Sequence, residues 1–397
     1  MTNRRNFVKG AAASGITFCG CNMFETAHAQ MPGGAALADA REGGHDNGDN
    51  PALKYKHPKL GTKRKSEMIN GKRVKAIDTH AHCFFRETVK MAGPGVSVNA
   101  AVKGGPQFYI LPATDTDAVN DRLAYMDAKG VDMEVLSINP FWYNKNRDIA
   151  TEIVNIHNAK LSELCEAHPK RFTAFCSLAL QYPDLAVEQL TKAMKMPGMR
   201  GAAVGATVLQ TDFSDPKFHP VWAKAEELGA VLFMHPQSTP QLAARFKGNG
   251  WVSNTIGNPL DTTIALEKLI YEGTLDKFPG LKLIAAHGGG FLPSYAPRMD
   301  HSCFVSPTSC NPDIVLKKKP TEYLNQLYFD SLVFTPEALR HLVAQVGASQ
   351  VVIGTDSPIP WEIAPVDHVM ATPGLKPAER AAIIGGNAAK LLKITNI

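Results

Sequence analysis

The sequence contains 397 residues, of which 44% are hydrophobic and 20% are charged. This hydrophobic content is enough for a sizeable core, and the length suits one α/β barrel with insertions. The formal net charge of +5 belongs to residues 1–73, which hold 12 Lys and Arg against 6 Asp and Glu; the remainder is nearly neutral. The basic run at 54–65 lacks interleaved aromatic residues, so we expect a solvated linker with no nucleic-acid-binding role.

Residues 1–29 resemble a twin-arginine export signal. Arg4 and Arg5 precede a short apolar stretch, and Ala27 and Ala29 are the small residues that a signal peptidase recognises. We therefore expect cleavage after Ala29 and a periplasmic location. No later segment is apolar for 18 residues, so we expect no transmembrane helix in the mature chain.

The rest of the chain divides into a leader and one folded unit. Residues 30–73 are rich in Gly, Asp, Asn, Pro and Lys and have no apolar periodicity, which indicates a flexible leader. Residues 74–397 alternate helix-length segments with eight apolar runs of strand length, at 74–78, 132–138, 172–178, 199–205, 230–235, 281–287, 327–333 and 350–356. This alternation predicts a parallel sheet covered by helices, and eight units favour closure into a (β/α)8 TIM barrel.

Residues that can bind a metal follow or end four of these runs. His80 and His82 follow the first run, and His235, His287 and Asp356 end the fifth, sixth and eighth. Active groups of such barrels lie at the carboxyl ends of the strands, so we expect the five side chains to converge. Taken singly, each has an ordinary alternative: a hydrogen-bonded histidine at a strand end, in the core or in a turn, or a capping carboxylate. Their coincidence at four strand ends favours a divalent metal site.

Alternation along the first strand adds a further residue to this group. Side chains two apart point to the same face of a strand, so His80 and His82 can both reach one ion. Asp78 shares that face, and we expect it to support the ligands from behind. The three glycines after His287 either let the backbone approach a ligand closely or serve only the turn.

The segments that carry these residues resemble a known family. The D-x-H-x-H motif at 78–82, the H-G-G-G motif at 287–290 and the G-T-D motif at 354–356 are similar to those of the amidohydrolase superfamily. The longer segments 275–301 and 351–362 look like the branch that contains aminocarboxymuconate-semialdehyde decarboxylase. The resemblance implies a TIM barrel with a metal ion at the carboxyl ends of its strands.

The resemblance also implies a role for each residue of the cluster. The metal, usually zinc, with manganese or another divalent ion as an alternative, would be held by His80, His82, His235 and Asp356. His287 would act as the catalytic acid and base, with Asp356 beside it sharing in catalysis. Three imidazoles, one carboxylate and one exchangeable water are typical of an open catalytic site.

Two further residues are candidates for binding the substrate. Arg298 matches a family arginine that reaches the neighbouring subunit's site and pairs with a substrate carboxylate, which implies a homodimer. Its alternative is a surface arginine on a helix. Trp142, flanked by Phe141 and Tyr143, could line a pocket for an aromatic substrate, although such a cluster is as often plain packing.

The resemblance favours a metal-dependent, non-oxidative decarboxylase of a small aromatic or unsaturated carboxylic acid. Hydrolysis of an amide, lactone or other carbonyl compound by the same residues is an alternative that the sequence does not separate from it. A metal-binding or ligand-binding periplasmic protein without turnover is a third.

Cysteine usage does not indicate a disulfide framework. Seven cysteines become five after cleavage, and these are scattered along the chain. Cys303 and Cys310 are close enough to pair in an oxidising compartment, but we expect two free, partly buried thiols.

Overall fold

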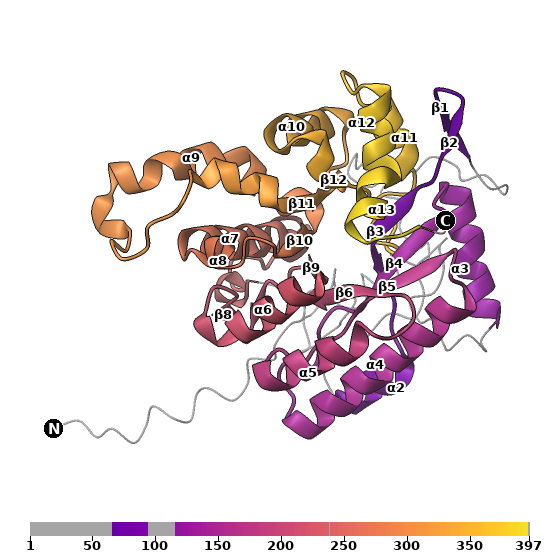
Figure 1. Ribbon diagram of the computed structural model, residues 1–397, viewed down its shortest axis with the longest axis horizontal. Helices are drawn as coiled ribbons and strands as arrows, with labels where there is room; N and C mark the ends of the chain where they lie inside the picture. The colour runs from indigo at the N-terminus through magenta and orange to yellow at the C-terminus, as the bar shows by residue number, and fades with distance from the viewer. Residues whose placement is uncertain (1–65, 94–115, 238, 396–397) are drawn as a thin grey trace.

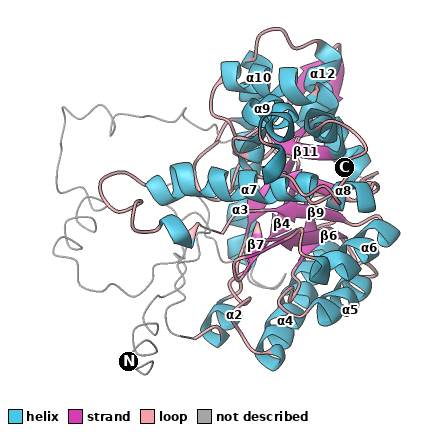
Figure 2. Ribbon diagram, turned by 90° about the vertical axis from the view of Figure 1, so that its left-hand side faces the viewer, coloured by secondary structure: helices cyan, strands magenta, loops and turns pink. Residues whose placement is uncertain are grey.

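The computed structural model describes residues 66–93, 116–237 and 239–395. Its centre is a sheet of eight parallel strands: β3 (Ile77–His82), β4 (Met133–Ser137), β5 (Phe172–Cys176), β6 (Met199–Val204), β9 (Val231–Met234), β10 (Lys282–Ala285), β11 (Leu327–Asp330) and β12 (Val351–Val352). The order β12-β11-β10-β9-β6-β5-β4-β3 follows the chain. Helices surround the strands (Figure 2). The predicted TIM-like barrel of eight parallel strands is therefore confirmed.

The barrel closes between its first and last strands without a regular ladder. Two isolated parallel bridges join the strands there, Asp78 with Ile353 and Ala81 with Ser357. The backbone amide of His82 also donates to the carbonyl of Ser357 at 2.6 Å. We call this closure between β3 and β12 the seam.

The first strand begins later than predicted. The run expected at 74–78 is displaced to Ile77–His82, so His80 and His82 lie within β3 and do not follow it. All six side chains of β3 are buried, because its faces are covered by the barrel interior and by helices. The strand can therefore carry polar residues only where these have partners.

Twelve helices labelled α are present in the described part of the chain. They are α2 (Arg86–Met91), α3 (Thr116–Lys129), α4 (Arg147–Ala167), α5 (Pro183–Ala193), α6 (His219–Leu228), α7 (Asn258–Tyr271), α8 (Thr274–Lys277), α9 (Leu292–Val305), α10 (Pro336–Val346), α11 (Pro365–Ala371), α12 (Pro377–Ala381) and α13 (Asn387–Leu391). Helix α4 illustrates why they form: Asn146 caps it by accepting from the amide of Ile149, and one face buries Ile153, Val154 and Leu161. None of the described helices is long and apolar enough to cross a bilayer.

The end of the predicted leader is ordered. Strands β1 (Glu67–Ile69) and β2 (Lys72–Val74) pair in an antiparallel hairpin. Asn70 and Gly71 connect them with φ of 51° and 74°, the backbone that an Asn-Gly turn favours. The leader prediction is therefore wrong for residues 67–73. The export signal at 1–29, the basic run at 54–65 and the leader up to residue 65 lie outside the described residues.

Helix α9 and the loop that follows it, residues 292–316, project from the barrel (Figure 1). We call this segment the α9 arm. Cys303 and Cys310 form a disulfide there, with their Cα atoms 5.7 Å apart, so the prediction of free thiols is wrong. Spacing alone did not reveal that the chain reverses after α9 and brings the two residues within bonding range. The free cysteines of the described residues, Cys83, Cys165 and Cys176, are buried.

Candidate metal centre

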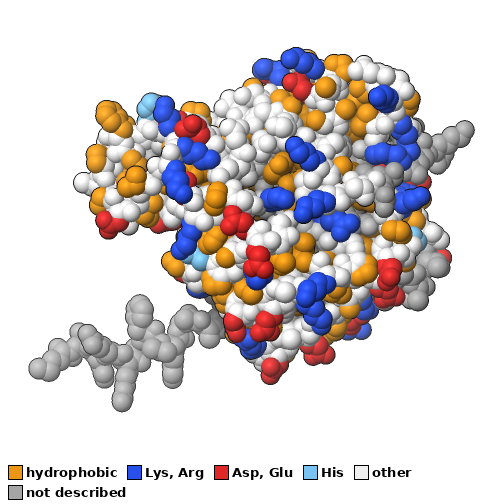
Figure 3. Space-filling model, in the orientation of Figure 1, with side chains coloured by type: hydrophobic (Ala, Val, Ile, Leu, Met, Phe, Trp, Pro, Cys, Tyr) orange, Lys and Arg blue, Asp and Glu red, His pale blue; other side chains and the backbone are white. Residues whose placement is uncertain are grey.

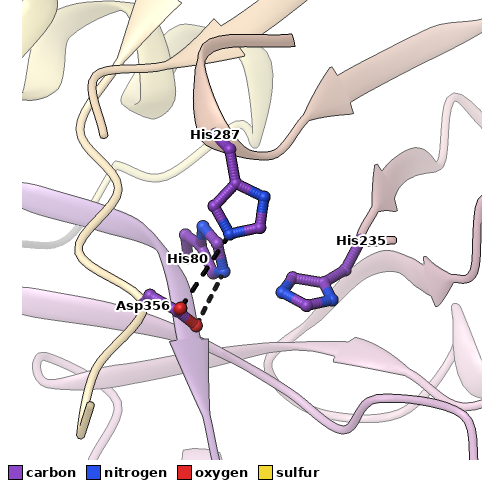
Figure 4. Close-up of side chains that lie close together, drawn as sticks. All are labelled: His80, His235, His287 and Asp356. Atoms are coloured by element: carbon purple, nitrogen blue, oxygen red, sulfur yellow. Dashed lines mark ion pairs between the residues drawn. The ribbon is translucent and has the colours of Figure 1, made fainter. Parts of the chain in front are cut away.

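Five side chains from four strand ends meet at one place on the barrel. His80 and His82 come from β3, His235 follows β9, His287 follows β10 and Asp356 follows β12. Possible ligand atoms of four of them, His80, His235, His287 and Asp356, all lie within 4.8 Å of one another (Figure 4). The predicted convergence at the carboxyl ends of the strands is present in the structure.

His82 joins this group through Asp356. Its Nε2 atom lies 2.8 Å from Oδ1 of Asp356 and 3.0 Å from Nε2 of His80. The same carboxylate oxygen is 3.1 Å from Nε2 of His80, and the other is 3.9 Å from Nε2 of His287. Asp356 is therefore the group around which the imidazoles gather.

The outer nitrogens of three rings are held by protein oxygens. Nδ1 of His80 lies 2.7 Å from Oδ2 of Asp330, and Nδ1 of His82 lies 3.0 Å from the hydroxyl of Ser137. Nδ1 of His235 lies 2.8 Å from the carbonyl of Pro236. Such partners fix the ring orientation and leave Nε2 as the metal-binding nitrogen.

Charge in the cluster is unevenly shared. Burial alone would lower the pKa of His80, but the nearby carboxylates of Asp356 and Asp330 raise it to about 10. Burial lowers the pKa of His82 to about 4. Although burial opposes its ionisation, Asp356 has a pKa well below its usual range because imidazoles surround it. The carboxylate thus stays ionised and attracts positive charge to this point.

This donor set fits a divalent metal ion. Imidazole nitrogens and an ionised carboxylate bind zinc and similar ions, and burial excludes competing water. His80, His82, His235 and Asp356 are at most 1% exposed, whereas the side chain of His287 is 14% exposed. Of the five residues, His287 alone is both adjacent to the carboxylate and partly accessible.

The turn after β10 sets the position of His287. Residues His287–Gly289 form the short helix η5, and His287 has φ of 57°. A Cβ atom on Gly290 would lie 2.1 Å from the carbonyl of Pro259, so only glycine fits there. Gly288, Gly289 and Gly290 have φ of 63°, 75° and 66°, and this supports the role of the glycines in the turn. Asp356 also has a positive φ, of 59°, so two residues of the cluster share this uncommon backbone.

Asp330 is a functional residue that sequence reasoning missed. Besides holding His80, it accepts hydrogen bonds from the backbone amides of His287 at 3.0 Å and Gly288 at 2.8 Å. Its only signal is one acidic residue in the apolar run "LYFDSLV". A buried carboxylate at the end of such a run needs partners, and this requirement is the signal that could have identified Asp330.

Asp78 supports the cluster through the backbone. One carboxylate oxygen accepts from the amide of His80 at 3.0 Å and from the amide of Thr355 at 3.2 Å. Burial raises its pKa to about 6. Asp78 supports the ligands as expected, and it does so by accepting hydrogen bonds from backbone amides and from the Thr355 hydroxyl.

The two predicted substrate residues lie in different surroundings. Trp142 is fully buried, and its indole nitrogen donates to the carbonyl of Leu178 at 2.9 Å. This is the position of a packing residue, and a role in substrate binding stays a prediction. Arg298 is exposed on α9, where it lines a hollow with Leu260, Glu267 and Tyr271. It is not part of the cluster.

The structure is an eight-stranded parallel α/β barrel with imidazoles and a carboxylate clustered at its strand ends. This arrangement defines the class of metal-dependent barrel enzymes. Residues 77–394 match the model of the Amidohydrolase family, and the chain belongs to that family.

Relatives with known names are similar over most of the chain. The 2-amino-3-carboxymuconate-6-semialdehyde decarboxylase of Dictyostelium discoideum is 29% identical over 274 residues, which cover 68% of this chain and 75% of that protein. The structure of a 2,6-dihydroxybenzoate decarboxylase complexed with 2,6-dihydroxybenzoate superposes with a TM-score of 0.69 at 26% identity, covering 81% of this chain and 100% of the other. A dihydroxybenzoic acid decarboxylase from Polaromonas sp. JS666, with bound manganese and 2-nitroresorcinol, gives a TM-score of 0.65 at 25% identity, over 81% and 97% of the chains.

Proposed function

We propose that the protein is a metal-dependent, non-oxidative decarboxylase of an aromatic carboxylic acid. The observation that carries the proposal is the cluster itself: four buried side chains that can bind a metal, His80, His82, His235 and Asp356, with the partly accessible imidazole of His287 beside their carboxylate. The similar proteins named above are decarboxylases of dihydroxybenzoates or of a carboxymuconate semialdehyde.

In this reaction four residues of the cluster bind the metal and His287 transfers the proton. His80, His82, His235 and Asp356 would hold a divalent ion, which would supply a Lewis acid for an oxygen of the substrate. His287 delivers a proton to the carbon that bears the carboxylate. The bond from that carbon to the carboxylate then breaks, its electron pair stays on the carbon, and CO2 leaves. The step needs no oxidant or reductant.

The surroundings of His287 suit a proton donor. Asp330 accepts hydrogen bonds from the backbone amides of His287 and Gly288, so the backbone that carries the imidazole is held in place. Its Nε2 atom is 3.9 Å from Asp356, and its Nδ1 atom has no hydrogen-bond partner among the described residues.

Unpartnered polar groups after the carboxyl ends of β4, β11 and β12 support a substrate with oxygen substituents. The amide of Asn139 follows β4, and the hydroxyls of Ser331 and Ser357 follow β11 and β12. All three residues are at most 3% exposed, and these groups have no partner among the described residues. Buried polar groups normally pair, so a substrate bearing hydroxyl groups would satisfy them.

For the metal we propose zinc, with manganese as the alternative. Three imidazoles and one carboxylate are a common zinc set, whereas the Polaromonas relative holds manganese. Both ions accept this mixture of nitrogen and oxygen donors.

We also propose a homodimer formed through the α9 arm. Tyr295, Phe304 and Val305 are 59%, 86% and 75% exposed there, and the space-filling view shows the arm standing clear of the barrel (Figure 3). Exposed apolar side chains gathered on one projection favour contact with another protein surface. Arg298, on the same helix, would reach the substrate of the neighbouring subunit.

Export to the periplasm is a further proposal. It rests on the sequence of residues 1–29, with Arg4, Arg5 and the Ala27 and Ala29 positions. The disulfide between Cys303 and Cys310 is consistent with an oxidising compartment.

The experiment that tests the activity uses the mature protein with its metal quantified. Hydroxybenzoates and other aromatic acids are screened for CO2 release, and esters, lactones and amides are screened for hydrolysis. Release of CO2 from an aromatic acid supports the proposal. Cleavage of a carbonyl substrate without any CO2 release would overturn it in favour of hydrolysis, and metal content well below one ion per chain would overturn the site.

A further inference from the structure

Helix α3 carries two buried cations that the reaction does not use. Arg122 is not exposed, and Lys129 is only 2% exposed. They are seven residues apart, which is nearly two helical turns, so both lie on one stripe of α3. Burying a charge is costly unless partners compensate it, so each side chain calls for a specific role.

Lys129 acts on the β12 side of the seam. Its Nζ atom donates to the hydroxyl of Thr355 at 2.9 Å, and Thr355 immediately precedes Asp356. The same hydroxyl accepts from the amide of Ser357 at 3.2 Å and donates to a carboxylate oxygen of Asp78. The hydroxyl of Thr355 therefore accepts two hydrogen bonds and donates one, which saturates it.

Asp78 carries this chain of contacts across to β3. Its other oxygen accepts from the amides of His80 and Thr355, at 3.0 and 3.2 Å. One carboxylate thus joins the backbone next to Asp356 with the backbone of His80. Lys129 is the cation that faces this carboxylate from α3, and the charges of the two attract each other.

Arg122 acts on the β3 side. Its Nη1 atom donates to the carbonyl of His82 at 3.0 Å, and its Nε atom donates to Glu134 of β4 at 2.7 Å. The two cations of α3 therefore hold the backbone beside ligands on opposite sides of the seam.

The seam is where such support matters. His80 and His82 lie on one side and Asp356 on the other, and isolated bridges replace a ladder between the strands. The spacing of the ligands therefore depends on how closely β3 and β12 approach. Hydrogen bonds from Lys129 and Arg122 on α3 can set that spacing without contacting a ligand side chain.

We propose that Lys129 is a positioning residue for the metal centre, holding Asp78 and Thr355 so that the ligands of β3 and β12 stand at binding distance across the seam. This inference rests on the metal site and is independent of the reaction that the site catalyses.

The test is metal affinity, measured by chelator competition with zinc and with manganese on the full mature chain. Lys129→Met keeps most of the apolar stem and removes the charge, and we expect about a tenfold loss of affinity, as for other supporting residues. The rise in melting temperature on adding metal should shrink, while kcat at saturating metal stays within about threefold. Thr355→Val removes the bridging hydroxyl and should act in the same way.

Lys192→Met, at an exposed position on α5, is the matched control and should bind metal as the wild type does. If Lys129→Met lowers the melting temperature equally with and without metal and leaves affinity unchanged, Lys129 is only structural and the proposal falls. If Lys129→Met does not fold, metal affinity is measured on Lys129→Arg and Thr355→Val instead. Unchanged metal affinity in Thr355→Val overturns the proposal. Failure of the wild type to bind metal would instead remove the site itself.

Discussion

Oδ2 of Asp330 lies 2.7 Å from Nδ1 of His80, and neither side chain is exposed to solvent. The same oxygen accepts from the backbone amide of His287 at 3.0 Å. One carboxylate on β11 therefore orients a proposed metal ligand and places the proposed acid and base. The geometry of the two depends on a residue outside the proposed ligand set.

Replacing Asp330 should weaken metal binding. Asp330→Asn keeps the size of the side chain but loses one acceptor, so His80 is no longer held in one orientation. We expect a loss of metal affinity of about 10- to 100-fold, measured by chelator competition. Asp313→Asn, at an exposed position, serves as the control. Unchanged affinity in Asp330→Asn would mean that the ring of His80 is fixed by other contacts.

Replacing His287 should slow turnover strongly while the metal remains. His287→Gln removes the proton donor, and general acid-base catalysis is worth about 100- to 10,000-fold in rate. We expect kcat to fall in that range while metal content per chain stays the same, measured by CO2 release and by elemental analysis. His341→Gln, on the exposed face of α10, is the control. Loss of metal from His287→Gln would instead make His287 a ligand, and undiminished CO2 release would refute its role.

Removing the metal should cost both activity and stability. Binding to the folded state alone stabilises it by about 2.7 kcal/mol when the free metal is at 100 times its Kd. Dialysis against a chelator should therefore lower the melting temperature and end CO2 release, and zinc or manganese should restore both. Calcium, which prefers oxygen ligands, should restore neither. Recovery with calcium would argue against ligation by the imidazoles.

The shared-site dimer predicts complementation between two impaired variants. Arg298→Ala should weaken substrate binding, and His80→Ala should lose metal. Mixed dimers then contain one site with all its residues, so part of the activity should return when the two are combined. Absence of any recovery, with mixed dimers demonstrated by differential tagging, would contradict the assignment of Arg298 to the neighbouring site.

His157 should make stability depend on pH. It is buried between the hydroxyls of Ser177 and Thr88, at 3.0 and 2.8 Å, and burial lowers its pKa to about 3. Below about pH 6.5 the histidine is protonated in the unfolded chain but stays neutral in the folded protein. The contribution of His157 to the free energy of unfolding is therefore complete above that pH and is lost progressively between about pH 6.5 and 3. The slope contributed is at most about 1.4 kcal/mol per pH unit.

Urea denaturation at several pH values checks this prediction. Between pH 6 and 4, the free energy of unfolding should fall less steeply for His157→Gln than for the wild type. His341→Gln, an exposed histidine replaced in the same way, should keep the wild-type slope. Equal slopes for all three proteins would show that His157 titrates normally in the folded state.

The barrel and most of the cluster could be predicted because their signals are local. Each buried parallel strand appears as a short apolar run, and a histidine or aspartate that ends such a run is conspicuous. His80, His82, His235, His287 and Asp356 were all identified in this way. The hairpin at 67–74 also had a local signal, the Asn70-Gly71 pair, but the composition of the surrounding leader obscured it.

Other features depend on contacts between distant segments. Asp330 reaches His80 across 250 residues of sequence, and Lys129 reaches Thr355 across 226. Nothing near Lys129 in the sequence distinguishes it from a solvated lysine, because its partner Thr355 lies far along the chain. The pairing of Cys303 with Cys310 likewise depends on how the chain turns after α9.

The seam has a consequence for the order of events during synthesis. His80 and His82 leave the ribosome early, but Asp356, on the other side of the closure, follows them by more than 270 residues. A nascent chain therefore displays imidazoles long before it can present the carboxylate that gathers them. The complete ligand set forms only after the last strand has been synthesised, so a metal-loaded chain is one whose barrel is closed.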